Sequence, residues 1–324
     1  MEQATRTFPA FDTWNTIQIA GFNGDGEAVL DKAEQLSQHF HNLFNHTDAN
    51  SALGKLNAAG GEAVATDPTL AALIQLALGY CERTDGLFDI TVGPAVKLWD
   101  FQSAQTPTEA DLAQACSHVD WRKVHVDGTT VQLEDPDAAL VLGGIAKGYV
   151  ADALCDLLVE EGVEHAIVNL GGNVKVMGGR AVGLAKRVAA GSAVEPWNVG
   201  LRAPVPTGQA DERSFGYVKV ADAAVVTSGV YERSFIDESG QLRHHILDPK
   251  TGMPVETDLL SASLVCESAL DADAYATALV AMGLERALAF VEDLPNTEAV
   301  FIGRDGLVYA TSGIGKTIPF ELLD

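Results

Sequence analysis

The sequence predicts an α+β or mixed α/β fold in which helices pack on a mixed β-sheet. Three observations lead to this prediction. Amphipathic helical stretches and strand-like runs are intermixed along the chain, two strand-like runs end directly in a glycine pair, and no repeat of fixed period or low-complexity tract interrupts the pattern. No segment has the composition of a linker, so we expect residues 1–324 to form one domain, either as one unit or as two closely packed lobes.

Helices are expected where apolar residues recur at helical spacing. They cover the ranges 27–44, 68–83, 107–115, 145–161, 269–282 and 285–291. Thr108 is expected to cap the third of these helices, with Glu109 and Asp111 in its first turn.

Strands are expected where residues alternate in polarity or form short apolar runs. They cover the ranges 16–19, 86–94, 124–126, 131–133, 140–142, 165–170, 218–226, 299–302 and 307–310. Residues 45–57 read as a loop with a short turn, and 241–254 as a hairpin-like loop. Residues 181–211 are rich in Gly, Ala and Pro, so we expect a loop or insertion that contains one strand at 197–201.

Composition indicates which classes of binding partner are unfavourable for this chain. The chain is 47% hydrophobic, enough for a sizeable core without disulfides, and its net charge is -24 at pH 7. Such an acidic surface repels phosphate backbones, so we expect neither a nucleic-acid partner nor docking on anionic lipid. Any phosphate-bearing ligand must then be held locally, by backbone amides, a metal ion or a few cations.

Cysteine usage and the first residues bear on the compartment. Cys81, Cys116, Cys155 and Cys266 form no CxxC pair, so buried reduced thiols are expected rather than disulfides or a zinc site. No stretch resembles a membrane span, and residues 1–14 lack the regions of a signal peptide. The chain as written is therefore expected in the cytoplasm.

The first candidate site is the turn from Leu142 to Tyr149, which contains Gly143 and Gly144. Free N–H groups at a helix N-terminus bind anions, and glycine lets a phosphate approach the backbone closely. Lys147 falls in the first helical turn, where a cation is unfavourable for the helix dipole, which suggests a ligand for its ammonium group. A tight structural turn with a solvated lysine explains the pattern equally well.

A second candidate site lies on the helix expected at 269–282. Asp273 and Thr277 are four residues apart, so they share one helix face, whereas Asp271 points elsewhere and is expected to cap the helix. A carboxylate and a hydroxyl side by side are hard oxygen ligands that suit Mg²⁺ better than zinc. Taken alone, such a pair is more often structural, with the carboxylate near the helix dipole and the threonine as a packing residue.

A third candidate site holds the adjacent histidines His244 and His245, which precede a strong Asp-Pro-Lys-Thr-Gly turn. Adjacent strand residues point to opposite faces, so we expect one histidine to face a site and the other to face solvent, rather than a two-histidine metal centre. Histidine suits a general base that activates a hydroxyl near neutral pH. The alternative is a histidine that only hydrogen-bonds the turn.

Two weaker signals are the run Thr227-Ser228-Gly229 and the glycine pair Gly171-Gly172, which either contact a polar ligand or only form turns. No G-x-S-x-G, Walker A or G-x-G-x-x-G motif is present, so hydrolase, NTPase and Rossmann interpretations lose their usual support.

Taken in order, these segments resemble the ApbE family of FAD:protein FMN transferases. The matching segments cover nearly the whole chain and are 11–13, 51–57, 86–94, 143–149, 169–173, 227–229, 245–252 and 273–277. Each motif is modest, whereas the ordered set is specific.

The resemblance implies a flavin site, a magnesium site and a base. The residues expected to contact FAD are Phe11, Leu87, Phe88, Asp89, Lys147, Thr227 and Leu247. Mg²⁺ is expected to be held by Asp273, Thr277 and the backbone carbonyl of Gly144, with Ala146 as the alternative. His245 is expected to help deprotonate the acceptor hydroxyl.

The implied reaction is a Mg²⁺-dependent transfer of FMN from FAD to a Ser or Thr hydroxyl of an acceptor flavoprotein, with release of AMP. If water attacks instead, the chain is a FAD pyrophosphatase. Family members usually carry an Asp two residues before the glycine pair, where this chain has Val141, so a FAD-binding protein without turnover is a third hypothesis. Family members are also often exported lipoproteins, whereas no lipobox is visible here.

Overall fold

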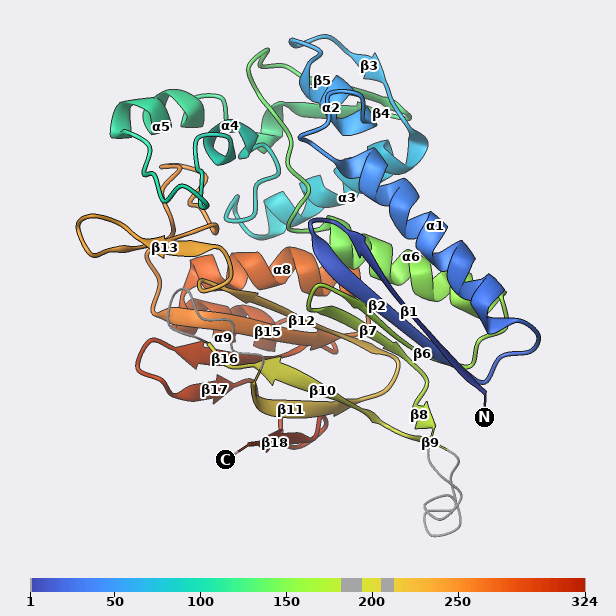
Figure 1. The fold of residues 1–324 in the computed structure, drawn as a ribbon. Helices are drawn as coiled ribbons and strands as arrows, with labels where there is room; N and C mark the ends of the chain where they lie inside the picture. The colour runs from blue at the N-terminus through green and yellow to red at the C-terminus, as the bar shows by residue number, and fades with distance from the viewer. Residues whose placement is uncertain (1, 182–193, 205–212, 324) are drawn as a thin grey trace.

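A computed structural model describes residues 2–181, 194–204 and 213–323 (Figure 1). Its helices are α1 (Gly26–Phe44), α2 (Ala52–Asn57), α3 (Pro68–Arg83), α4 (Gly93–Val96), α5 (Glu109–Cys116), η1 (Trp121–Lys123), α6 (Ala146–Glu160), α8 (Ala269–Met282) and α9 (Leu284–Glu292). Its strands are β1 (Gln3–Ala10), β2 (Thr13–Ala20), β3 (Val64–Ala65), β4 (Val124–Asp127), β5 (Thr130–Leu133), β6 (His165–Leu170), β7 (Asn173–Met177), β8 (Arg180–Ala181), β9 (Val194–Glu195), β10 (Trp197–Arg202), β11 (Ser214–Val220), β12 (Ala223–Gly229), β13 (Ser234–Ile236), β14 (Leu242–His244), β15 (Leu259–Cys266), β16 (Glu298–Gly303), β17 (Val308–Ala310) and β18 (Phe320–Leu322).

The main sheet has eight strands in the order β1-β2-β6-β7-β12-β15-β16-β17. The α+β class is therefore confirmed, but the expected mixed sheet is wrong, because each neighbouring pair in this sheet is antiparallel. Short turns join β1 to β2, β6 to β7 and β16 to β17, and a short turn can connect only antiparallel neighbours.

Helices cover one face of this sheet, and the small sheet β10-β11-β18 covers part of the other (Figure 1). Because side chains alternate along a strand, each central strand contributes to both interiors. On β15, Leu264 belongs to the helix-side core and Val265 to the core between the two sheets. The sheet thus lies between two hydrophobic cores, and the helix-side core is the one that carries α6 and α8.

A third group of apolar residues lies between α4, α5 and the β13–β14 hairpin. It contains Ala95, Trp99, Leu112, Phe235 and Leu247. This group connects the upper part of the molecule in Figure 1 to the loop that follows β14.

The predicted helices are confirmed as α1, α3, α5, α6, α8 and α9. Thr108 caps α5 as expected, because its Oγ1 accepts a hydrogen bond from the amide of Asp111 at 3.1 Å. Asp271 does not cap α8: the cap is Ser268, whose Oγ accepts from the Asp271 amide at 3.1 Å.

Two predicted strands are wrong. Residues 86–94 form turns that lead into α4, since Gly86 has a φ of 74° and the Asp89 carboxylate accepts from the Thr91 amide at 2.8 Å. Residues 140–142 are extended but lie outside any sheet, because the Asn57 side chain bonds both the amide and the carbonyl of Leu140. The two segments contact each other through one isolated parallel bridge, Val92 with Ala139, and through the Val141 amide that donates to the Ile90 carbonyl, which is too little pairing to form a strand.

Other strands differ from the prediction in number. The single run expected at 218–226 is the end of β11 and the start of β12, which belong to different sheets and are separated at Asp222, where φ is 47°. Strand β15 was not predicted, because it is buried on both faces and shows no alternation. The loop expected at 45–57 contains α2, capped by Ser51.

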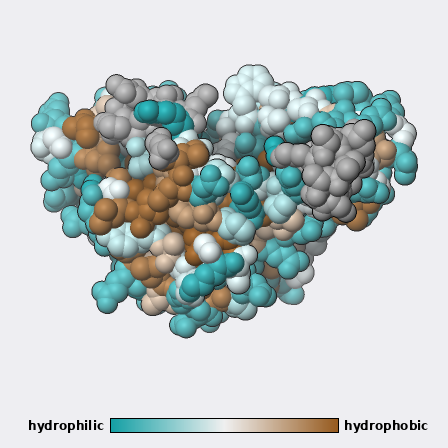
Figure 2. All heavy atoms as spheres, turned by 90° about the horizontal axis from the view of Figure 1, so that it is seen from below, coloured by the Kyte–Doolittle hydropathy of each residue, from teal (hydrophilic) through white to brown (hydrophobic). Residues whose placement is uncertain are grey.

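Much of the segment 181–211 lies outside the described residues, and the strand expected there is confirmed as β10. Apolar side chains gather on the lower face of the molecule (Figure 2), and the exposed apolar residues near the C-terminus are Leu307, Val308, Leu322 and Leu323. In the part of the chain that the structure describes, no helix is both long and apolar enough to cross a membrane. The four cysteines are free thiols, of which only Cys116 is partly exposed.

Candidate active site

The first turn of α6 and the first half of α8 meet at a close helix crossing. The amide of Gly148 donates to Oδ2 of Asp273 at 2.9 Å, and this carboxylate is only 4% exposed. A Cβ added at Gly148 would lie 2.2 Å from the carbonyl oxygen of Ala269, so only glycine permits this approach. Thr277 lies one turn further along α8, and a Cβ at Gly144 would come within 3.6 Å of its hydroxyl oxygen. The crossing therefore gathers Gly144, Asp273 and Thr277 in one place.

This corner, where the first turn of α6 meets α8 at Gly144, Asp273 and Thr277, suits a hard divalent cation. In the ranges 2–181, 194–204 and 213–323, no cationic side chain pairs with the Asp273 carboxylate, and its Oδ1 accepts no hydrogen bond. Burying a charged carboxylate without a cation beside it costs desolvation free energy, so a bound cation would offset that cost. The Thr277 hydroxyl, which lies 3.3 Å from Oγ of Ser228, and the backbone oxygens of the glycine turn are further hard donors.

The glycine turn is less open to an anion than the sequence predicts. The Ala146 amide already donates to the Leu142 carbonyl at 2.8 Å, and the Gly148 amide is taken by Asp273. Among the described residues, the amides of Gly143, Gly144 and Lys147 make no hydrogen bond, so they are the donors left for a phosphate. The Lys147 ammonium donates to the Gly143 carbonyl at 3.3 Å, and in the part of the chain that the structure describes it makes no other hydrogen bond.

Two arginines act together with Lys147 on the carboxylate of Glu232. The Arg202 guanidinium lies 3.8 Å from the Glu232 carboxylate, and burial raises the pKa of Glu232 while Lys147, Arg202 and Arg233 act to lower it. No local motif marks either arginine, so neither is among the residues predicted from the sequence. Arg202 comes from β10 and Arg233 from the loop before β13, and only the tertiary fold lets them act with Lys147 on Glu232. In an acidic chain, this local group of cations is where an anionic ligand would be held.

The histidine pair closes the same region. His245 donates its amide to the carbonyl of Arg233 at 3.1 Å, and its Nδ1 makes no hydrogen bond with the described residues. Burial lowers the pKa of His245 to about 3, and electrostatic repulsion of its protonated form by Arg233, His244 and Lys147 lowers it further. The imidazole is therefore neutral near pH 7, which is the form that accepts a proton.

The expectation that one histidine faces solvent is wrong. His244 is 1% exposed, and burial lowers its pKa to about 4. His244 is the last residue of β14 and pairs with Ser234, whereas His245 lies in the bend that follows. His244 is thus a buried neutral residue, and His245 is the histidine that lies near the cations.

Three comparisons place this geometry among known proteins. Residues 11–301 match the model of the ApbE family. This chain belongs to the ApbE family. A FAD:protein FMN transferase of Treponema pallidum is 39% identical over 89% of this chain and 80% of its own length, and one of Klebsiella pneumoniae is 33% identical over 86% and 83%. The predicted membership of an enzyme family is thereby confirmed.

Solved structures of ApbE proteins have the same fold. The ApbE protein of Thermotoga maritima superposes with a TM-score of 0.84 at 27% identity, covering 96% of this chain and 97% of that one. The flavin transferase ApbE of Vibrio cholerae gives a TM-score of 0.81 at 26% identity with the same coverage.

The remaining ApbE-derived predictions concern flavin contacts. Phe88 is buried beside the glycine turn, because a Cβ at Gly144 would lie 3.1 Å from its ring. Leu87 and Asp89 flank it and are half-buried, and burial raises the pKa of the Asp89 carboxyl. Val141 adjoins this segment, since its amide donates to the Ile90 carbonyl at 2.8 Å. Leu87 to Asp89 thus lie at the corner where α6 and α8 meet.

Three other predicted contacts lie outside this corner. Phe11 sits in the two-residue β1–β2 turn, where its amide donates to Nδ1 of His41 at 3.1 Å. Leu247 is buried in the apolar group between α4, α5 and β13. Thr227 hydrogen-bonds Ser263 across the sheet, on the face opposite α8, and it is Ser228 whose hydroxyl reaches Thr277.

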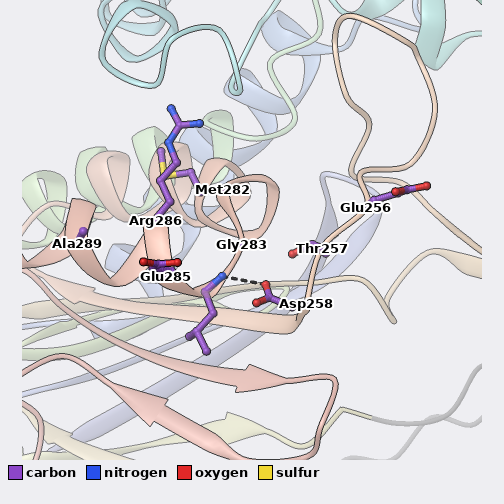
Figure 3. Close-up of a pocket in the computed structure, with 9 residues that line it drawn as sticks. Glu256, Thr257, Asp258, Met282, Gly283, Glu285, Arg286 and Ala289 are labelled. Atoms are coloured by element: carbon purple, nitrogen blue, oxygen red, sulfur yellow. Dashed lines mark hydrogen bonds between the residues drawn. The ribbon is translucent and has the colours of Figure 1, made fainter.

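An open pocket of about 790 Å³ lies at the other end of α8 (Figure 3). Its lining includes the acidic residues Glu256, Asp258 and Glu285, while Arg286 points away from Asp258 in this view. Oδ1 of Asp258 accepts from the Leu284 amide at 2.9 Å, so it caps α9. Three carboxylates around one opening do not suit a dinucleotide, and no predicted site residue lines it.

Proposed function

We propose that this ApbE-family chain transfers the FMN part of FAD to a Ser or Thr hydroxyl of an acceptor flavoprotein, with Mg²⁺ and with release of AMP. The acceptor oxygen forms a bond to the FMN phosphorus, and the bond from that phosphorus to the AMP oxygen breaks. The leaving AMP takes the electron pair, and the hydroxyl proton goes to a base. The relatives named FAD:protein FMN transferase support this proposal.

One observation carries the proposal beyond family membership. Asp273 is a buried carboxylate that pairs with no cationic side chain among the described residues; it lies at the helix crossing beside the glycine turn, and Thr277 follows it on the same helix face. Asp273, Thr277 and the Gly144 carbonyl would hold the Mg²⁺ ion. When bound, Mg²⁺ neutralises diphosphate charge and favours loss of the phosphate leaving group.

The chain's own residues supply the other requirements. The free amides of the glycine turn and the Lys147 ammonium bind the diphosphate, and Arg202 and Arg233 balance the charge that develops on AMP. The neutral imidazole of His245 has an unused Nδ1 and accepts the proton of the acceptor hydroxyl.

The test combines the chain with FAD, MgCl₂ and a purified acceptor domain. We expect AMP by chromatography and a covalently flavinylated acceptor by intact mass. Asp273→Asn keeps an oxygen for the Gly148 amide but loses the charge, so it should lower the rate of both products by at least about 10²-fold. The matched control is Asp271→Asn on the same helix, whose side chain still accepts from the hydroxyl of Tyr80.

The outcomes separate the three hypotheses. FMN and AMP without labelled acceptor identify a FAD pyrophosphatase. Tight FAD binding without AMP release identifies a binding protein and gives Val141 a functional consequence. Full activity of Asp273→Asn with excess chelator present would refute the metal assignment.

A further inference from the structure

The carboxylate of Asp152, on α6, closes the N-terminus of α8. Its Oδ1 accepts from the Ala269 amide at 3.0 Å, and its Oδ2 accepts from the Leu270 amide at 3.0 Å and from Oγ of Ser268 at 3.2 Å. The first amides of a helix have no partner within it, and a carboxylate there also interacts favourably with the helix dipole. Asp152 therefore supplies from a neighbouring helix a cap that α8 does not provide for these two amides.

Another hydrogen bond between the two helices has its carboxylate on α8 and its amide on α6. Asp273 accepts from the Gly148 amide, so each helix has its first turn bonded to a carboxylate of its neighbour. Gly148 and Asp152 are four residues apart and share one face of α6, the face on which α8 lies. Two bonds one helical turn apart prevent α8 from sliding or rotating against α6.

Lys175, on β7, completes the arrangement. Its ammonium is 2.9 Å from Oδ1 of Asp152 and also donates to the carbonyl of Glu267, the residue before the α8 cap. The lysine side chain is 14% exposed and that of Asp152 27%. Asp152 and Lys175 thus connect the sheet and α6 to the N-terminus of α8. Leu270, at this end of α8, lies seven residues before Thr277.

We infer that Asp152 is a positioning residue for the proposed metal site. It touches neither the metal donors nor the substrate. It fixes α8 so that Asp273 and Thr277 face the Gly144 turn, which means that its loss moves the donors apart. This inference rests on the proposed function, and its test measures metal binding rather than transfer.

The experiment measures Mn²⁺ binding to the full chain by electron paramagnetic resonance, with Mn²⁺ alone as the probe. In Asp152→Asn, the side-chain NH₂ replaces one of the two oxygens and faces a donor amide of α8 in either orientation, so one of the two bonds to the α8 amides is lost together with the negative charge. We expect the Mn²⁺ dissociation constant to rise by about 10-fold or more, as for other supporting residues of metal sites. Thr108→Ala removes the cap of α5 at a similar cost in stability, and it should change this constant by less than about twofold.

A second variant separates positioning from stability. Asp152→Asn leaves the Lys175 ammonium without its carboxylate, and the double variant Asp152→Asn/Lys175→Met removes that unpaired charge. Stability should then recover while Mn²⁺ affinity stays low. Recovery of both together would overturn the inference, because Asp152 would then act only through Lys175.

The controls distinguish this inference from the proposed function. If the unaltered chain binds Mn²⁺, Asp273→Asn does not, and Asp152→Asn binds normally, the positioning role is refuted and the metal site stands. If neither the unaltered chain nor Asp273→Asn binds Mn²⁺, the metal site fails and this inference fails with it.

Discussion

At the scale of the residue, the protonation state of His245 follows from its surroundings. Burial is the largest cause of its low pKa of about 3, and Arg233, His244 and Lys147 add to it. A base acts in its neutral form, so the imidazole stays competent as pH falls through 6.5, the ordinary pKa of histidine. Binding of an anionic dinucleotide beside the same cations would raise this pKa towards the operating pH, where proton acceptance is more favourable.

We predict that kcat/KM for flavin transfer shows no acidic limb near pH 6.5, because that ratio reports the free enzyme. His245→Asn should lower kcat by about 10²- to 10⁴-fold, the usual contribution of a general base. AMP release measured at intervals from about pH 8 to about pH 5.5 checks both statements. His125→Asn, at an exposed histidine on β4, serves as the control. A limb near pH 6.5 that disappears in His245→Asn would contradict the low pKa.

Single residues were predictable where local spacing alone determines geometry. The helical period placed Asp273 and Thr277 on one face, and the structure puts both beside the Gly144 turn. Strand alternation separates Thr227 from Ser228, but the sequence does not reveal which of the two faces α8. Arg233 acts with Lys147 on Glu232 only through tertiary packing, so no pattern along the chain indicates it.

At the scale of the element, the α6–α8 crossing depends on a missing side chain. We predict that Gly148→Ala lowers the free energy of unfolding by about 1–3 kcal/mol, because the added Cβ would lie 2.2 Å from the Ala269 carbonyl oxygen and 2.7 Å from the Cβ of Asp273. Helix propensity alone would make the same change stabilising by about 0.5–1 kcal/mol, so the sign of the effect reports the crossing. Urea unfolding followed by circular dichroism measures it.

Gly79→Ala on α3 is the matched control. A Cβ there would meet only the Arg83 guanidinium, at 3.8 Å, so this variant should be neutral or stabilising. If Gly148→Ala were also stabilising, the two helices would not be in close contact at this point.

Elements were predictable when their residues carry one strong period. Helices α1 and α9 have it, and their predicted bounds agree with the structure to within one residue at each end. The run 86–94 alternates in polarity because turns bury Phe88 and Ile90, not because it pairs with a strand. Strand β15 has the opposite problem: it packs on both faces, so it shows no alternation.

At the scale of the whole molecule, the central sheet separates two hydrophobic cores, one on each face. No sequence pattern reveals that these cores share the same strands. Composition predicts that a large core exists, and the intermixed elements predict the α+β class. Strand direction and order depend on which distant segments pair, as β2 does with β6 across more than a hundred residues, so the antiparallel arrangement was not predictable. The helix-side core and the core under β10 and β11 then share the strands between them.

That sharing predicts one cooperative unfolding transition for the chain. Leu264 and Val265 are neighbours on β15 with side chains in different cores. Leu264→Ala should cost about 2–5 kcal/mol and Val265→Ala about 1.5–3 kcal/mol. Both substitutions should lower the midpoint of the same unfolding transition. The transition followed by tryptophan fluorescence should coincide with the one followed by far-ultraviolet circular dichroism. Leu322→Ala, at a position 58% exposed, should change stability by less than about 0.5 kcal/mol. Two separated transitions, of which Val265→Ala shifts only one, would instead mean that the two sheets unfold as independent lobes.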